Sequence, residues 1–454
     1  MPVNMVSHGH GQGYTDVNFI IPETVALMTY KKGAYYADVG DFSGAGSVSI
    51  DTAKEVEFNL VGLTLGEYGY RRGLVLGDSS AFGGHTLYAV ELSQYDGPWS
   101  DINEDVEKYN VLLKHNHDLA GGDFEVSLMA YDNTWNSADQ IPARAVDLGI
   151  ISELGSLDDS VGGETSRYSL NTNWEKDGWK VSAYTIDYQL NLWSNFTYFL
   201  DDEVNGDQFE QVDSRRIYGG QIEYNSDFEF KNKPMSNRYG LQVRIDDIDE
   251  VGLYHTARRE RLGVTRSDEI MQSNVAAFWE NKIAWSSNLR SVIGFRYDTI
   301  DYDVTSLLGE NRYGVDLSSN GGKASDSLFS AKGSLIYAFN DNWESYVSAG
   351  QGYHSNDARG AVISVDPASG ESVGRVDPLV RSTGYEFGAR GFLLDQLNTS
   401  FSLWSLELDS ELLFVGDAGN TEATRPSERK GFELVLNYYP VSYTHLTLPT
   451  TSRV

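Results

Sequence analysis

Hydrophobic and polar residues alternate along much of this chain, most clearly over Ser327–Tyr385. In the first part of this stretch every second position is apolar or small, namely Phe329, Ala331, Gly333, Leu335, Tyr337 and Phe339. A period of two predicts a β-strand with one apolar face and one polar face. A polar turn at Asn340–Asn342, a second extended run over Trp343–Tyr353 and a long polar segment over His354–Thr383 follow. The repeating unit is therefore strand, short turn, strand and long loop.

The same alternation predicts about sixteen strands along the chain. Many of them approach the length of about nine to eleven residues that a tilted membrane-spanning strand needs. The predicted strands are Phe58–Leu65, Tyr70–Gly77, Thr86–Tyr95, Val106–Leu119, Phe124–Tyr131, Arg167–Trp174, Trp179–Leu190, Ile217–Tyr224, Tyr239–Ile245, Val275–Trp285, Leu289–Tyr302, Leu328–Phe339, Trp343–Tyr353, Tyr385–Leu394, Leu397–Leu408 and Phe432–Tyr438.

The connections between these strands alternate between short and long. The predicted short turns are Gly121–Gly122, Asp177–Gly178, Asn232–Asn237, Ser286–Asn288, Asn340–Asn342 and Asp395–Gln396. The predicted long loops are Asp96–Asp105, Asp132–Ser166, Asn191–Arg216, Asp246–Asn274, Asp303–Ser327, His354–Thr383 and Ser410–Lys430. Long loops that recur on one side only are uncommon in compact soluble domains. They are typical of a bacterial outer-membrane barrel, which has short periplasmic turns and long outer loops.

The composition agrees with a β-rich membrane protein. The chain has 28 Tyr, 19 Phe and 45 Gly but only 10 Pro, which suits strands and turns. No apolar run approaches the length of about eighteen residues that a membrane helix needs. The mean hydropathy of -0.38 is compatible with a barrel, because alternation hides the apolar face. Cysteine is absent, so neither disulfides nor thiolate metal sites are available.

The formal net charge of -31 argues against nucleic acid as a partner, because nucleic acid needs clustered Lys and Arg. Most of the carboxylates are expected to form a solvated acidic surface. The alternative is a set of acidic outer loops, or an acidic lumen, that attracts cationic ligands. The acidic groups over Asp246–Glu250 and Asp298–Asp303 lack the Gly and the terminal Glu of a calcium loop. They are therefore expected to be solvated loop residues.

Residues 1–51 depart from the alternation and are rich in glycine. The segments Pro2–Asn4, Phe19–Glu23 and Lys31–Gly46 resemble the second half of the plug domain of TonB-dependent outer-membrane receptors. Ala34 stands where this family usually has proline, and Asp41–Phe42 interrupts the small-residue run that leads into the first barrel strand. The family's signal sequence, its TonB-contacting box and the first half of its plug have no counterpart here.

Several later segments resemble the barrel of the same family. They are His354–Gly360, Val376–Ser382, Gly384–Gly388, Asp409–Leu412 and Asp417–Asn420. The resemblance implies an all-β fold: a transmembrane antiparallel β-barrel of about 22 strands when intact, of which about 16 are here. It also implies that residues 1–51 are the C-terminal part of the plug and residues 52–440 an incomplete barrel. The chain is thus expected to be a fragment, truncated at both ends and unable to close a barrel alone.

The last residues, 441–454, break the pattern. Val441–Leu446 back-translates naturally to a transposon end that is used to prepare sequencing libraries. The segment is therefore expected to be adapter read-through, the alternative being a genuine loop.

Two groups of residues are candidates for binding a ligand. The first is the glycine-rich stretch that contains His8, His10, Gln12 and Tyr14. Its imidazoles could ligate a transition metal or hydrogen-bond a chelate. Without a third ligand, contact with a carried solute is favoured over metal coordination, because plug loops of the resembled family face the vestibule. The alternative is a plug loop whose histidines are satisfied by packing.

The second group lies where a predicted strand opens into an outer loop. It consists of Tyr353, His354, Asn356, Asp357 and Arg359. Aromatic, imidazole and guanidinium groups at such a place can hold a substrate by stacking and by charged hydrogen bonds. Packing between loops is an equally weighted alternative.

The resemblance implies a function in transport. Such receptors are monomers in the outer membrane of Gram-negative bacteria, in contact with its lipid. They bind a scarce solute, most often a ferric siderophore or another metal chelate, and import it when the TonB–ExbB–ExbD complex pulls on the plug. Vitamin B12 and glycans remain open as ligands. No cofactor is implied, and no nucleophile elbow or zinc-helix motif indicates an enzyme. The alternatives are a passive porin-like channel and a soluble secreted β-protein that acts on glycans.

Overall fold

The computed structural model describes residues 1–394, 396–415, 420–423 and 425–439. Its main feature is one antiparallel sheet of 16 strands, each paired with the next strand of the sheet along the chain. These strands are β3 (Leu60–Leu65), β4 (Arg71–Ala81), β5 (Gly84–Tyr95), β6 (Val106–Leu119), β7 (Gly122–Asn136), β8 (Gly162–Lys176), β9 (Trp179–Ser194), β10 (Phe209–Phe230), β11 (Lys233–Ala257), β12 (Glu260–Ala284), β13 (Leu289–Ser306), β14 (Gly322–Ala338), β15 (Trp343–Ser355), β16 (Leu379–Leu394), β17 (Leu397–Leu408) and β20 (Ser427–Tyr438). Each predicted strand overlaps one of them, so the all-β prediction is confirmed. The segment predicted to be adapter read-through, 441–454, lies outside the described residues.

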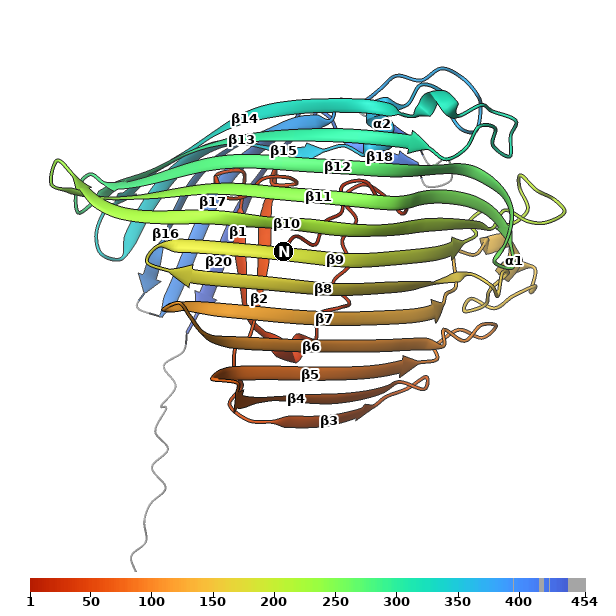
Figure 1. Ribbon diagram of the computed structural model, residues 1–454, viewed down its shortest axis with the longest axis horizontal. Helices are drawn as coiled ribbons and strands as arrows, with labels where there is room; N and C mark the ends of the chain where they lie inside the picture. The colour runs from red at the N-terminus through yellow and green to blue at the C-terminus, as the bar shows by residue number, and fades with distance from the viewer. Residues whose placement is uncertain (395, 416–419, 424, 440–454) are drawn as a thin grey trace, which may run out of the picture.

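The sheet curves around residues 1–59, here called the N-terminal segment, which lies on its concave side (Figure 1). This segment contains a separate hairpin of β1 (Val25–Lys32) and β2 (Gly46–Thr52). A second small hairpin, β18 (Leu412–Val415) and β19 (Asn420–Ala423), belongs to the connection between β17 and β20. Among the described residues the edges of the large sheet are β3 and β20, which are not paired with each other.

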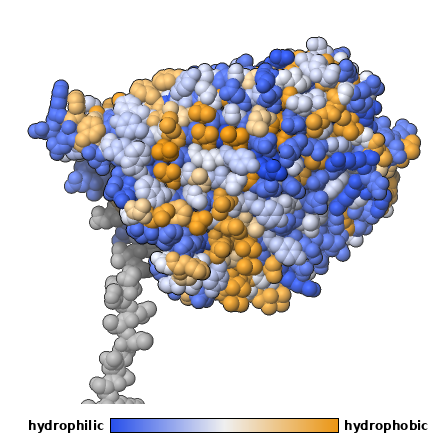
Figure 2. All heavy atoms as spheres, in the orientation of Figure 1, coloured by the Kyte–Doolittle hydropathy of each residue, from blue (hydrophilic) through white to orange (hydrophobic). Residues whose placement is uncertain are grey.

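Strand β14 shows how the two faces of the sheet differ. On its convex face Phe329, Leu335 and Tyr337 are 51%, 45% and 47% exposed, whereas Ser330 and Lys332 on the concave face are 0% and 4% exposed. Apolar side chains that point outward and polar ones that point inward are typical of a membrane-spanning barrel. Figure 2 shows hydrophobic residues gathered over the middle of the strands, with mostly hydrophilic residues at the end where the longer loops lie.

No helix in the described part of the chain is long and apolar enough to cross a membrane. The short helical segments are η1 (Pro22–Thr24), α1 (Ala143–Asp147), η2 (Ser318–Asn320) and α2 (Ala358–Val362).

Two-residue turns join several strands at the end of the sheet opposite the long loops. Ala120–Gly121, Asp177–Gly178 and Lys231–Asn232 have positive φ at both positions. This backbone belongs to a type I′ turn, whose twist matches that of the flanking strands. The predicted short turn at Asp177–Gly178 is confirmed, and the looser turn predicted over Asn232–Asn237 is shortened to two residues.

The prediction of a long loop over Asp246–Asn274 is wrong. Strands β11 and β12 are each 25 residues long, and only Arg258–Arg259 lies between them. Likewise β10 begins at Phe209, inside the loop predicted over Asn191–Arg216. The inward side chains of these segments are mixed: Asp246 and Gln272 are polar, whereas Ile248 and Ile270 are buried in the apolar cluster around α2. The two-faced pattern on which the sequence prediction rests is therefore missing there, although the strand continues.

Candidate ligand site and its contacts with the sheet

The first group of predicted site residues lies in a tight loop at the start of the N-terminal segment. A hydrogen bond from the Met5 N–H to the Tyr14 carbonyl (2.9 Å) closes this loop. The loop packs against β10, where a Cβ added to Gly9 would lie 2.5 Å from the carbonyl oxygen of Val212. Only glycine lets the backbone come this close to the sheet.

His8 is fully buried, and both of its ring nitrogens are engaged. Nε2 lies 3.2 Å from the Tyr188 hydroxyl, and Nδ1 accepts a hydrogen bond from the His10 N–H (3.0 Å). The ring also stacks on Tyr14 at a centroid distance of 4.1 Å. Burial lowers the pKa of His8 to about 3, although Asp213 acts in the opposite direction. The imidazole is thus neutral and has no nitrogen left for a metal.

His10 and Gln12 face more open surroundings. His10 is exposed, with Nδ1 2.8 Å from the Gln211 side-chain oxygen. The Gln12 amide donates to Asn356 Oδ1 (3.3 Å) and accepts from the Asp357 N–H (3.0 Å). The structure thereby brings the two predicted groups together, although they are far apart in the sequence. In the part of the chain that the structure describes, no group of three or more His, Cys, Asp or Glu could hold a metal ion.

Most of the second group is buried in the interface between the sheet and the N-terminal segment. Tyr353 donates to Asp298 (2.6 Å), and the Asn356 amide donates to the Asp377 carbonyl (2.7 Å). The Arg359 guanidinium forms an ion pair with Asp357 (2.6 Å) and donates to the His8 carbonyl (2.9 Å).

His354, the remaining member of this group, is half-buried. Its ring stacks on Phe42 of the N-terminal segment at a centroid distance of 6.4 Å. The five residues therefore line up along the interface, with contacts to both sides. Ligand binding by either of the two predicted groups stays a prediction.

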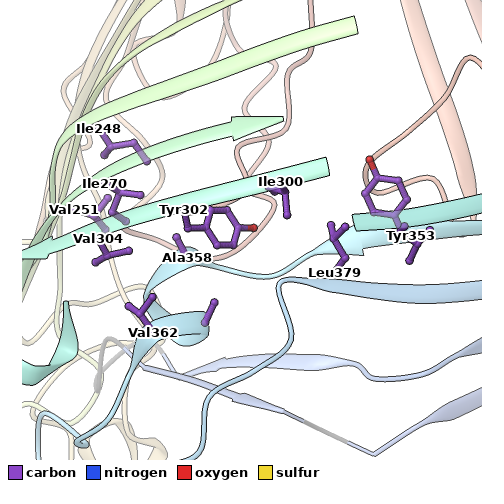
Figure 3. Close-up of a cluster of buried hydrophobic side chains, with 12 residues drawn as sticks. Ile248, Val251, Ile270, Ile300, Tyr302, Val304, Tyr353, Ala358, Val362 and Leu379 are labelled. Carbon is purple, nitrogen blue, oxygen red and sulfur yellow. The ribbon is translucent and has the colours of Figure 1, made fainter. Parts of the chain in front are cut away.

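The loop between β15 and β16 is anchored by an apolar cluster (Figure 3). Ala358, Ala361 and Val362 of α2 pack with buried side chains that point inward from neighbouring strands. Those side chains include Ile248, Ile270, Ile300, Tyr302 and Val304. The loop is consequently folded into the concave side of the sheet, and its start lies against the N-terminal segment.

A set of buried ion pairs that the sequence analysis missed lines the concave face. Four neighbouring strands, β10 to β13, each carry an Arg and an Asp two positions apart, at N–O distances of 2.5–2.8 Å. The pairs are Arg215 with Asp213, Arg244 with Asp246, Arg266 with Asp268 and Arg296 with Asp298. Residues two apart in a strand share a face, but only Arg296 and Asp298 lie together within a predicted strand, because the pairs of β10 and β12 fall in segments predicted to be loops.

The expectation that Asp246 and Asp298 are solvated loop residues is wrong. Both side chains are at most 1% exposed and are paired with arginine. Arg244 also donates to the Asn4 carbonyl (2.7 Å), and Arg215 donates to the Ser7 carbonyl. These carboxylates hold the arginines that contact the N-terminal segment.

Asp41 is a buried acid of the N-terminal segment itself. It accepts hydrogen bonds from the N–H (2.7 Å) and the hydroxyl of Ser355 in β15 and from the Phe42 N–H (2.8 Å). Burial raises the pKa of Asp41 to about 6, although these hydrogen bonds act to lower it. This contact fastens the N-terminal segment directly to a strand of the sheet.

The buried imidazole predicts a pH dependence of stability. The pKa of His8 is lower in the folded protein than in the unfolded chain, so below pH 6.5 the unfolded chain takes up a proton that the folded protein does not. The free energy of unfolding therefore falls as the pH falls below 6.5. Between pH 6.5 and 5 the native chain is expected to lose about 2 kcal/mol of unfolding free energy that the His8→Gln variant keeps. Urea unfolding in detergent at several pH values measures this difference. His10→Gln, in the same loop, is the control, and an equal pH dependence of native chain and His8→Gln would contradict the prediction.

Comparison with protein families found a match over more than half of the chain. The family described as "TonB dependent receptor-like, beta-barrel" matches residues 95–452. A comparison with curated proteins found no match.

Solved structures of two transporters and of an outer-membrane receptor share the fold. The copper transporter OprC is 14% identical with a TM-score of 0.69, and the alignment covers 96% of this chain and 68% of that one. The ferric citrate transporter FecA is 14% identical with a TM-score of 0.67, covering 88% and 59%. The alcaligin receptor FauA from Bordetella pertussis is 15% identical with a TM-score of 0.59, covering 90% and 64%. The chain thus spans about two thirds of the length of these proteins.

Proposed function

This chain belongs to the TonB-dependent receptor family, and from this premise we propose that it serves active import of a scarce solute across the outer membrane of a Gram-negative bacterium. The observation that carries the proposal is the N-terminal segment folded inside the curved sheet (Figure 1). A passive porin needs an open lumen, whereas this segment fills the concave side. The apolar convex face supports a membrane location over a soluble glycan-active protein.

The contacts around the N-terminal segment suit a plug that has to move. Many of them are polar, such as Lys332 to the Ala34 carbonyl (3.1 Å) and Arg238 to Asp38 (3.0 Å). Water can replace polar contacts when they open, which makes such an interface easier to separate than a continuous apolar core. We propose that energy for the opening comes from the TonB–ExbB–ExbD complex, with no reaction catalysed.

We propose a ferric siderophore or another metal chelate as the solute. The similar structures include receptors or transporters for alcaligin, ferric citrate and copper, which supports this class. His10, Gln12 and Tyr14 retain exposed surface and are the members of the N-terminal loop that we expect to touch it. Arg359 and Asp357 would then couple the loop between β15 and β16 to the N-terminal segment, because they hydrogen-bond to His8 and Gln12.

Uptake of radiolabelled iron from a panel of ferric siderophores tests the proposal. Cells that express the receptor from its native locus are expected to take up at least one member. A protonophore should reduce this uptake to the level of a deletion strain. Uptake that persists in the presence of the protonophore would instead support the porin-like alternative.

A further inference from the structure

One row of inward-facing residues runs across five strands, each residue directly opposite the next. The row consists of Asn110 on β6, Tyr131 on β7, Arg167 on β8, Tyr188 on β9 and Arg215 on β10. All five side chains are buried. The two arginines in the row differ in one respect. Arg215 is paired with Asp213 and Asp246, whereas Arg167 forms no ion pair with any described residue.

Arg167 is 3% exposed, and its Nε and Nη2 atoms are buried without a hydrogen-bond partner. The other buried arginines among the described residues, Arg215, Arg266, Arg296 and Arg359, are each paired with an aspartate. Arginine stays protonated in proteins, and a buried charge without a partner is strongly unfavourable. Something that is complementary to a guanidinium is therefore expected beside Arg167.

The free atoms form the edge of the guanidinium that suits a bidentate ligand. Nε and Nη2 point in parallel, and this edge typically holds both oxygens of a carboxylate or two oxygens of a phosphate. In Arg215 and Arg359 the same two atoms donate to an aspartate. The plane of the Arg167 guanidinium is covered by the Phe19 ring, whose centroid lies 4.5 Å from its central carbon. Stacking on the plane leaves the edge free to donate.

Two residues next to Arg167 also carry unpaired polar atoms. Tyr131 lies directly opposite Arg167 in the sheet, and Ser169 is two residues along the same face. Both hydroxyls are buried without a partner. Asp16 of the N-terminal segment is close enough for its charge to act on Arg167. Its Oδ1 atom, however, accepts from the N–H and the side-chain amide of Asn18, both at 2.8 Å.

We propose that Arg167 binds an oxyanion, a carboxylate or phosphate group, between Phe19 and the strands β7 and β8. The Nε and Nη2 edge holds the anion, and the hydroxyls of Tyr131 and Ser169 donate to it as well. The anion is either free in solution or a group of a larger solute. The evidence for this site is the set of contacts around Arg167, and it does not depend on which solute the receptor imports.

Thermal unfolding of the purified receptor, expressed from its native locus and held in detergent, tests this site. The probes are inorganic phosphate, acetate and citrate, added to a chloride buffer at constant ionic strength. The Tm of the native receptor is expected to rise with the anion concentration until the site is saturated, because an anion that binds only the folded state stabilises that state. The Arg167→Met variant is expected to show no rise. In chloride alone Arg167→Met should unfold at a higher temperature than the native receptor, since it lacks the unpaired buried charge.

Two further variants separate anion binding from packing. Arg215→Met removes an arginine that has its carboxylate partners and is expected to lower the Tm in every buffer. Tyr131→Phe keeps the ring and is expected to weaken the apparent affinity for the anion several-fold without lowering the Tm in chloride. If Arg167→Met does not fold, the anion response of Tyr131→Phe tests the proposal in its place.

The choice of anion identifies the source. A rise with phosphate or acetate supports a free oxyanion, and a rise with citrate alone supports a group carried by a polycarboxylate solute. The proposal is overturned if no probe raises the Tm of the native receptor. It is equally overturned if Arg167→Met, or Tyr131→Phe where the former does not fold, responds as the native receptor does.

Discussion

Replacing Asp298 by alanine is expected to lower the unfolding free energy by about 3–5 kcal/mol, because it leaves a buried guanidinium without its counter-charge. Asp298 is 0% exposed and accepts hydrogen bonds from Arg296 Nε (2.8 Å) and Nη2 (2.8 Å). It also accepts from the Tyr353 hydroxyl (2.6 Å). Arg296 is 3% exposed and donates to Gln242 and to the Ala37 carbonyl of the N-terminal segment. The loss is expected to loosen that segment as well as the sheet.

Two matched variants test whether the unpaired charge is the cause. Asp303→Ala removes a carboxylate from the same strand whose ion pair with Lys323 is solvent-exposed, and it is expected to cost at most about 1 kcal/mol. Arg296→Met combined with Asp298→Ala removes both charges and is expected to recover most of the stability. Equilibrium unfolding by guanidinium chloride in detergent measures all three. If Asp298→Ala alone lowers the unfolding free energy by less than about 1 kcal/mol, Arg296 and Asp298 do not form a buried ion pair in the folded protein.

The strands were predictable because every second residue of a membrane-spanning strand faces lipid and is therefore apolar. In β14, Phe329, Leu335 and Tyr337 must be apolar, while Ser330 and Lys332 between them are free to be polar. Where lipid does not impose this alternation, the prediction fails. Over Asp246–Asn274 the inward residues include both polar side chains and apolar ones such as Ile248 and Ile270, so the sequence indicated a loop although β11 and β12 continue.

The candidate site was predictable in residue type but not in its contacts. Arg359 and Asp357 were recognised as charged groups at the mouth of a strand, and the sequence offered ligand binding or loop packing. Their actual partners include His8 and Gln12, 351 and 345 positions away. Contacts at this separation depend on how the whole sheet curves around the N-terminal segment, and neither periodicity nor local spacing encodes that. The Arg–Asp pairs of β10 to β13 are different, since their two-residue spacing is local, but two of the four pairs lie in segments that were predicted to be loops and their shared face was therefore hidden.

A disulfide that ties the N-terminal segment to the sheet is expected to abolish proton-motive-force-dependent uptake. In the variant Asp41→Cys with Ser355→Cys the two sulfurs replace side chains that touch, since the Ser355 hydroxyl donates to the Asp41 carboxylate. A disulfide needs Cβ atoms about 3.5–4.5 Å apart, so non-reducing electrophoresis first checks that this pair has formed. The chain has no other cysteine, so no competing pairing exists within it. If the N-terminal segment has to leave β15 during import, the oxidised receptor retains the solute and dithiothreitol restores uptake.

The matched control is a disulfide within the sheet. Ser334→Cys with Ser348→Cys joins β14 to β15 at directly opposite residues, whose hydroxyl oxygens are 2.8 Å apart. This bond joins two strands of the sheet and makes no covalent link to the N-terminal segment, so uptake is expected to continue in its oxidised form. The single variants Asp41→Cys and Ser355→Cys account for the loss of the hydrogen bonds themselves. Equal uptake by the oxidised and reduced forms of the Asp41–Ser355 tether would mean that the solute passes while the N-terminal segment stays fixed to β15, and opening would then have to occur along another part of the interface.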